Sequence, residues 1–198
     1  MEFYESFMKF SFADEDVFCL ENDALVIHSN NIKACECVVL LHPKVAWIEA
    51  KASAPKEVAE SQFIEDIKQK FADSLRLFDD IKNRKYGEDA YLRLPVNLQN
   101  LPLNTDDYLI CLIVHGHKLE WLVSLQDAFR EAMREVIRQW NIKDSKVKVY
   151  NEETALEKRL IVAYIPKEMR DGVRDSHGNI SLEKMQQWFD EETNSTNR

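Results

Sequence analysis

Two short apolar segments, separated by only three residues, constrain the fold of this chain more than any other feature. Residues 34–41 (ACECVVLL) and 45–53 (VAWIEAKAS) flank the triplet His42-Pro43-Lys44. Apolar runs of this length on either side of a proline-containing turn are typical of a β-hairpin. From residue 57 to residue 83, apolar side chains recur every three or four positions, which predicts an amphipathic helix. The sequence therefore predicts a sheet with a helix packed against it.

The remaining segments alternate between strand and helix periodicity. We expect a short strand passing into a helix capped by Asn22 or Asp23 over 18–31, and a long loop with a short strand or helical turn over 86–107. A core strand over 108–116, a helix over 124–140, a strand over 146–150, another strand within 155–165 and a final helix capped by Ser181 follow. Interleaved strands and helices predict an α/β (α+β) fold with a central mixed β-sheet flanked by helices. We assign residues 1–170 to a single α/β domain and residues 171–198 to a C-terminal helix and polar tail.

Composition places the chain among soluble proteins of the cytoplasm. Its 198 residues are 45 % hydrophobic, enough for one substantial core, yet no run of about 18 apolar residues predicts a membrane span. The first residues, MEFYESFMKFSF, carry charges where a signal peptide needs an unbroken apolar stretch. Four cysteines are too few and too unevenly spaced for a disulfide framework, so we expect free thiols in a reducing compartment.

The net charge limits the kinds of partner. At −9, the charge argues against a protein whose whole surface grips nucleic acid, because such binding depends on clustered lysine and arginine. A local basic patch remains compatible with nucleic acid, and an acidic exterior is compatible with a protein partner.

The predicted hairpin gathers charged side chains on one face of the sheet. Glu49 and Lys51 are two residues apart on a strand and therefore point to the same side. If the turn is centred on 42–43, Leu41 faces Lys44 and Glu36 faces Glu49; a turn centred on 43–44 sets Glu36 against Lys51 instead. Either register brings two carboxylates and an ammonium together, with Cys35 and Cys37 pointing away. Paired carboxylates favour a hard divalent cation, Mg²⁺ or Mn²⁺.

A structural explanation of these charges stays open beside the chemical one. Strands of an antiparallel sheet often alternate apolar and polar residues because one face is exposed to water. On this interpretation Glu36, Glu49 and Lys51 form an ion-paired cluster on the open face of the sheet.

Two further candidate sites are interpreted as structural. The Cys-x-Cys at Cys35 and Cys37 has no second cysteine or histidine pair at zinc-site spacing, so both are expected to be small buried side chains. His115 and His117 flank Gly116 and favour a turn at the end of a strand.

Over roughly residues 18–165, the order of these features resembles the PD-(D/E)xK superfamily of restriction-endonuclease-like nucleases. An acidic residue in ACECVVLL, a hairpin, WIEAKAS and an amphipathic helix follow one another as in the core of that family. The resemblance implies a metal-dependent phosphodiester hydrolase acting on nucleic acid. Glu36 and Glu49 would bind Mg²⁺ or Mn²⁺, and Lys51 would stabilise the attacking hydroxide or the transition state.

The resemblance also suggests auxiliary residues and an alternative function. Glu21 matches an additional acid that some members carry, and Lys68 or Lys70 on the following helix would contact a substrate phosphate. Glu36 stands where the family usually has aspartate, and no proline precedes it. Some members keep the fold and lose catalysis, so the alternative is a catalytically silent interaction or regulatory module that binds a protein partner. Many such nucleases form homodimers.

Overall fold

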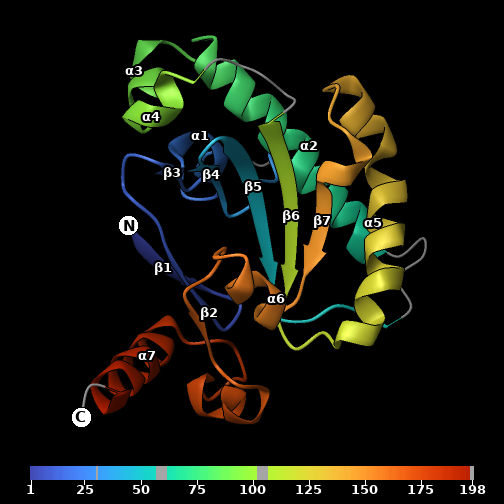
Figure 1. Cartoon of the computed structure of the whole chain (residues 1–198). Coiled ribbons are helices and arrows are strands. Elements are labelled where there is room, and N and C mark those ends of the chain that lie inside the picture. Colours follow the sequence, from blue (N-terminus) through green and yellow to red (C-terminus); the bar gives the residue numbers. More distant parts are fainter. Residues whose placement is uncertain (30, 57–61, 102–106, 197–198) are drawn as a thin grey trace.

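The computed structural model describes residues 1–29, 31–56, 62–101 and 107–196 (Figure 1). Its centre is a five-stranded mixed sheet with the strand order β3-β4-β5-β6-β7. The strands are β3 (Val17–Phe18), β4 (Cys37–Leu41), β5 (Lys44–Lys51), β6 (Tyr108–Val114) and β7 (Val147–Tyr150). Neighbours from β3 to β5 are antiparallel, whereas β5, β6 and β7 run parallel to one another. The predicted fold class, a central mixed sheet flanked by helices, is confirmed.

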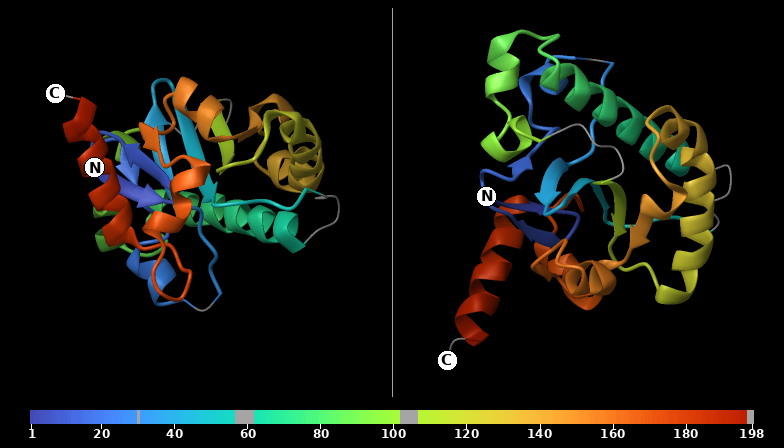
Figure 2. Two further views of the ribbon diagram at one scale, coloured as in Figure 1. Left: turned by 90° about the horizontal axis from the view of Figure 1, so that it is seen from below. Right: turned by 45° about the horizontal axis from the view of Figure 1, so that its top comes forward.

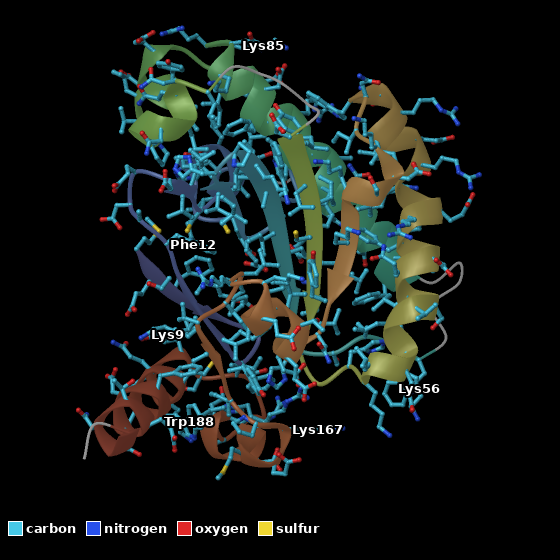
Figure 3. All side chains as sticks on the ribbon, viewed as in Figure 1. Lys9, Phe12, Lys56, Lys85, Lys167 and Trp188 are labelled. Atoms are coloured by element: carbon cyan, nitrogen blue, oxygen red, sulfur yellow. The ribbon has the colours of Figure 1, made fainter. Side chains whose placement is uncertain are left out.

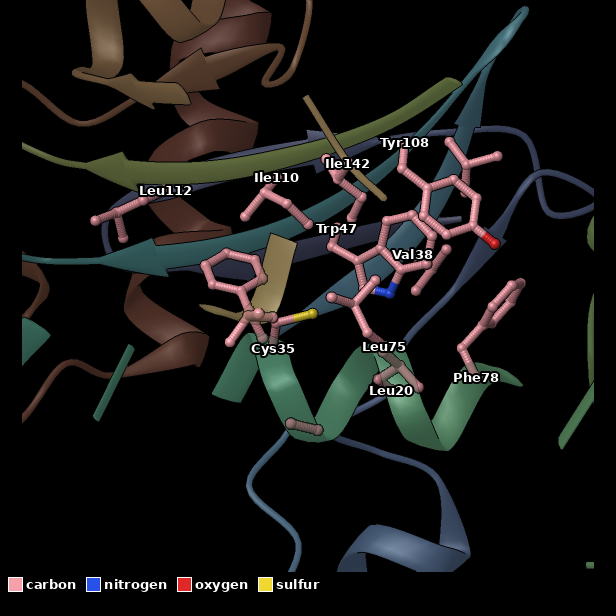
Figure 4. Close-up of a cluster of buried hydrophobic side chains, with 14 of the residues drawn as sticks. Leu20, Cys35, Val38, Trp47, Leu75, Phe78, Tyr108, Ile110, Leu112 and Ile142 are labelled. Carbon is pink, nitrogen blue, oxygen red and sulfur yellow. The ribbon is translucent and has the colours of Figure 1, made fainter. Parts of the chain in front are cut away.

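Two long helices cover one face of this sheet. α2 (Gln62–Lys82) connects β5 to β6, and α5 (Leu119–Gln139) connects β6 to β7, as parallel neighbours require a crossover. Both helices pack against the same hydrophobic cluster, in which Trp47 of β5 is fully buried. The Trp47 ring centroid lies 5.6 Å from that of Phe78 on α2 and 4.4 Å from that of Tyr108 on β6 (Figure 4).

A smaller sheet packs against the opposite face. Its order is β1-β2-β8, formed by β1 (Glu2–Glu5), β2 (Met8–Ser11) and β8 (Ala163–Tyr164). Met8 and Phe10 of β2 join a second hydrophobic cluster with Cys37, Ile48 and Cys111 of the large sheet. The central strands are therefore buried on both faces, which explains why their sequences are almost continuously apolar.

The C-terminal helix α7 (Leu182–Thr196) packs on the small sheet. The Tyr4 ring on β1 stacks on Phe189, with centroids 5.5 Å apart, and Phe7 shares a third apolar cluster with Met185. Figure 2 shows α7 beside the N-terminal strands, on the side of the molecule away from α5. Within the described residues, no helix is long and apolar enough to cross a membrane.

Shorter helices fill the remaining connections. They are α1 (Ala24–Ile27), α3 (Glu88–Leu92), α4 (Val96–Gln99), α6 (Glu152–Glu157) and the 3₁₀ turns Asp144–Lys146 and Lys167–Val173. Asp23 caps α1, because its side chain accepts a hydrogen bond from the Leu25 amide, in agreement with the sequence.

The expected helix over 124–140 begins five residues earlier, at Leu119. The connection over 86–107 carries two short helices, α3 and α4, where a short strand or a helical turn was expected. The segment 155–165 contains a strand as predicted, the two-residue β8, which follows the end of α6. A reciprocal hydrogen-bonded cap between Asn151 and Thr154 starts α6. Of the predicted segments, residues 57–61 and 102–106 lie outside the described residues.

Candidate functional site

Glu36, Glu49 and Lys51 meet at one end of the β4–β5 hairpin. Leu41 pairs with Lys44 and Cys37 with Ile48, which is the register with the turn centred on 42–43. Continued by one residue, this register places Glu36 beside Glu49. The sequence therefore predicted the convergence of these groups correctly, and it is the two carboxylates that face each other.

The face that carries Glu49 is covered, so the interpretation of an open, wet sheet face is wrong. Glu49 is 0 % exposed, because β6 flanks it in the sheet and α2 packs over that side. A buried carboxylate is costly unless it is paired. Glu36 is also buried, at 8 % exposure, at the point where the chain enters β4.

Two lysines neutralise Glu49 from different elements. The ammonium of Lys51, at the end of β5, lies 2.6 Å from Oε1, and that of Lys70 on α2 lies 2.9 Å from the same oxygen. Both ammonium groups contact the same oxygen, and among the described residues no donor reaches Oε2. Burial raises the pKa of Glu49, while the two lysines oppose that rise. Glu49 thus keeps an unsatisfied oxygen in a buried position.

Glu36 stores a proton in the cluster. Burial, the hydrogen bond with Glu21 and the nearby carboxyl groups of Glu49 and Glu5 together raise the pKa of Glu36 to about 10. The hydrogen bond between Glu36 and Glu21 lowers the pKa of Glu21, so Glu36 donates as the acid and Glu21 accepts as the carboxylate. Glu21 therefore belongs to the cluster, as the sequence suggested, although its side chain is exposed.

Helix α2 fixes the approach to β4 and so the place of Glu36. The Cys35 amide donates to the Ser74 hydroxyl at 2.8 Å, and the Lys33 amide donates to a carboxylate oxygen of Asp73 at 3.2 Å. These contacts draw Cys35 into the cluster beneath α2, so its predicted direction away from the site is wrong. Cys37 does face the opposite side of the sheet, as predicted.

Of the two candidate lysines on α2, one contacts the carboxylate cluster and the other does not. Lys70 joins the cluster through Glu49, whereas the Lys68 ammonium pairs with Glu65 on its own helix at 2.5 Å. Burial lowers the pKa of Lys70, but the nearby carboxylates, led by Glu49, outweigh that effect and the pKa is raised overall. Cys35 and Cys37 are free and buried, as predicted.

The histidines form the expected turn beyond β6. Gly116 between them has a φ of 70°, a conformation that favours glycine. The His115 side chain is buried, with Nε2 2.7 Å from the Ile165 carbonyl oxygen and Nδ1 against the Arg170 guanidinium. Both ring nitrogens are thus engaged by the protein.

Cavities lie on both sides of the carboxylates. One, of about 680 Å³, is lined by Phe3, Tyr4, Glu5, Cys19, Glu21, Asn22, Glu36, Leu182, Glu183 and Gln186. The other, of about 420 Å³, is lined by Lys33, Lys51, Phe63, Asp66, Ile67 and Lys70. Glu5, Glu183 and Lys33 were not predicted, since each comes from a segment outside the hairpin and its helix.

The residues present fit a hard divalent cation held by few protein ligands. Within the described parts of the chain, no three His, Cys, Asp or Glu side chains form a complete metal-binding group. Mg²⁺ often takes only one or two carboxylates and completes its shell with water and substrate phosphate. The unsatisfied Oε2 of Glu49, together with a proton on Glu36 that a cation would displace, provides such a partial set.

Comparisons with protein-family models, curated proteins and solved structures gave no match, so the site is interpreted through its own geometry.

Proposed function

We propose that this protein is a metal-dependent phosphodiester hydrolase that acts on nucleic acid, with Mg²⁺ or Mn²⁺ held by Glu36 and Glu49. The observation that carries the proposal is the fully buried Glu49, which lies between two lysines, keeps an oxygen without a donor and adjoins a second buried carboxyl. Buried charges of this kind concentrate at functional sites. The order of hairpin, helix and parallel strand adds support for the resemblance to PD-(D/E)xK nucleases.

Each side chain has a distinct role in this mechanism. Bound between Glu36 and Glu49, the cation would lower the pKa of a water molecule and neutralise charge at phosphorus. Lys51 is 31 % exposed at the end of β5, so its ammonium can reach a phosphate oxygen. Lys70 is less exposed, at 19 %, and opposes the rise in the pKa of Glu49 that burial causes. Glu21 accepts a hydrogen bond from the protonated carboxyl of Glu36.

The free cysteine thiols indicate the compartment in which the protein acts. All four cysteines are free, and three of them are buried. A reducing compartment keeps such thiols intact, so we place the activity in the cytoplasm.

A two-part experiment tests the proposal. Thermal unfolding with increasing Mn²⁺ is expected to raise the Tm of the wild type and of Glu65→Gln, an exposed control on α2, but not of Glu49→Gln. Single- and double-stranded DNA and RNA are then incubated in Mg²⁺. We expect cleavage that falls about 100-fold or more in Lys51→Met, a typical loss when a transition-state contact is removed. Equal Mn²⁺ responses in wild type and Glu49→Gln would contradict the metal site.

A second function is favoured by one observation. Lys51 and Lys70 already neutralise Glu49, so the cluster is stable without any ion. With a net charge of −9, the chain then fits a silent interaction module that binds a protein partner or forms a homodimer. Absence of cleavage on every substrate, with no Mn²⁺ response, would favour this alternative.

A further inference from the structure

The smaller cavity beside the carboxylates is lined mainly by basic side chains, whereas the larger one is lined by acidic side chains. Lys33, Lys51 and Lys70 line the smaller one, and among the described residues Asp66 is the single acidic side chain in its wall. The larger cavity is lined by Glu5, Glu21, Glu36 and Glu183. The hairpin end therefore separates an acidic cavity, suited to a cation, from a basic cavity, suited to an anion.

The basic cavity retains net positive charge after its ion pairs are counted. Lys51 and Lys70 share one oxygen of Glu49, so two ammonium groups face one carboxylate. Lys33 pairs with Asp66 at 3.0 Å, and both side chains of this pair are about half exposed. An incoming phosphate group can compete for Lys33 because exposed ion pairs contribute little, typically below about 1 kcal/mol.

An apolar wall completes the cavity. Phe63 is half-buried and Ile67 is buried, and both come from the first turns of α2. A volume of about 420 Å³ exceeds what one phosphate group needs and lies within the range of small-molecule sites. Aromatic faces next to lysines are the usual means by which proteins hold unpaired bases.

We propose that this cavity binds a phosphate of a nucleic-acid strand against Lys33 and Lys70, with the adjoining base or sugar on Phe63. The inference rests on the proposed function and deepens it, because it identifies the substrate as single-stranded nucleic acid or a frayed end. A paired base in a duplex is stacked and cannot reach Phe63. The cavity shares Lys51 with the hydrolytic site, so the bound phosphate adjoins the carboxylates.

Binding without divalent cations tests the cavity apart from the hydrolytic chemistry. Fluorescence anisotropy of a labelled 12-residue oligothymidylate in EDTA compares the wild type with Lys33→Gln, Asp66→Asn and Phe63→Leu. We expect Lys33→Gln to weaken binding about 5-fold or more, Asp66→Asn to tighten it about 3-fold, and Phe63→Leu to weaken it about 5- to 10-fold. A duplex of the same length should bind at least about 5-fold more weakly than the single strand.

The chain offers a charge-matched control at the other end of α2. Lys85 pairs with Asp80 just as Lys33 pairs with Asp66, and its side chain is similarly exposed, at 62 % against 56 %. Figure 3 shows Lys85 at the opposite end of the molecule from Lys56, which follows β5. Lys85→Gln and Asp80→Asn are expected to change binding less than about 2-fold, because their charge change lies more than a Debye length away.

The outcomes separate this inference from the proposed hydrolase. If Lys33→Gln and Phe63→Leu bind the oligonucleotide as the wild type does, or if duplex binds equally well, the cavity is not the nucleic-acid site, whatever the cleavage assays show. If the Lys33, Asp66 and Phe63 variants change binding as expected while Mn²⁺ stabilises wild type and Glu49→Gln alike, the cavity inference holds and the hydrolytic function fails.

Discussion

Glu36 and Glu49 are neighbours at one end of the hairpin, yet their electrostatic surroundings differ. Two ammonium groups contact one oxygen of Glu49 and oppose the rise in its pKa that burial causes. Among the described residues no lysine pairs with Glu36, and it faces the carboxyl groups of Glu21, Glu49 and Glu5, which favour its protonated form. Like charges at close range cannot both ionise without a compensating cation. One proton on Glu36 therefore replaces the second positive charge that a metal would bring.

The first prediction concerns the pH dependence of stability without metal. The pKa of Glu36 rises from 4.5 to about 10 on folding, so between these values the folded protein binds more protons than the unfolded chain. Stability contributed by this group is therefore present at low pH and is lost as pH rises through that window. Glu36→Gln keeps a donor for Glu21 and removes the titration. At pH 8 we expect the variant to be about 2 kcal/mol more stable than the wild type. An isolated group would contribute about 1.4 kcal/mol for each pH unit of the window, but the difference is smaller here because the carboxyl groups titrate together.

Urea unfolding in EDTA at pH 5 and pH 8 measures this difference. Near pH 5 the two proteins should unfold at similar urea concentrations, because Glu36 is protonated in the folded state. Glu183→Gln, an exposed change in the wall of the same cavity, is the control and should match the wild type at both values. A wild type whose advantage over Glu36→Gln grows with pH would contradict the assignment.

At the scale of elements, α2 is anchored in its middle and at its C-terminal end. In the middle, Lys70 pairs with Glu49, and Asp73 and Ser74 hold the chain before β4. At its last residue the Lys82 ammonium donates to the carbonyl oxygens of Leu98, Gln99 and Leu101 at 2.8 to 2.9 Å. The single ammonium thus closes the C-terminal end of α4, whose carbonyl groups lack helical partners.

The second prediction tests this anchor. Lys82→Met keeps the aliphatic stem and leaves the carbonyl oxygens without their donor, so we expect a loss of about 1–3 kcal/mol in unfolding free energy. Lys85→Met, three residues along, removes an ammonium that is 62 % exposed and pairs with Asp80, so it should lose less than about 1 kcal/mol. Urea unfolding of both variants gives the comparison. Equal losses would mean that Lys82 contributes no more than a surface ion pair.

Elements with a strong local sequence pattern could be predicted. Turns with an unusual backbone conformation, and contacts between segments distant in the sequence, could not. The hairpin follows from the apolar runs and the turn, which is why Glu36, Glu49 and Lys51 were expected to converge, whereas the choice between the two possible registers came from the structure. The β1–β2 hairpin was missed because its turn residues, Ser6 and Phe7, adopt positive φ without the glycine or asparagine that usually marks such turns. Lys33 was missed because only tertiary packing carries residue 33 to α2.

The burial of Glu49 was likewise beyond local patterns. Alternation along a strand shows which residues share a face, but it leaves open whether that face meets water or a helix. The position of α2 over β5 decides the matter, and it depends on apolar side chains such as Trp47 and Phe78 meeting across the two elements. The charged residues were thus located by sequence, while their environment came from the fold.

The whole molecule is acidic, but its charge is unevenly distributed around the site. With a net charge of −9, the general field repels nucleic acid, and the described wall of the basic cavity offers three lysines to a strand, Lys33, Lys51 and Lys70. The acidic cavity on the other flank discourages a second phosphate contact there. Binding should therefore be local and short, unlike the extended electrostatic contact made by basic nucleic-acid-binding proteins.

The last prediction is a shallow salt dependence. Each phosphate neutralised on a single strand contributes a slope of about −0.7 in a plot of log affinity against log salt concentration. Contacts from at most three lysines predict a slope of about −1 to −2 for oligothymidylate in EDTA between 50 and 300 mM KCl. Lys33→Gln should make the slope shallower by about 0.7, and Lys85→Gln should leave it unchanged. A slope steeper than about −4 would require many more basic contacts than the cavity holds. Such a result would place the nucleic acid on another surface, because the negative field of the remaining molecule cannot supply those contacts.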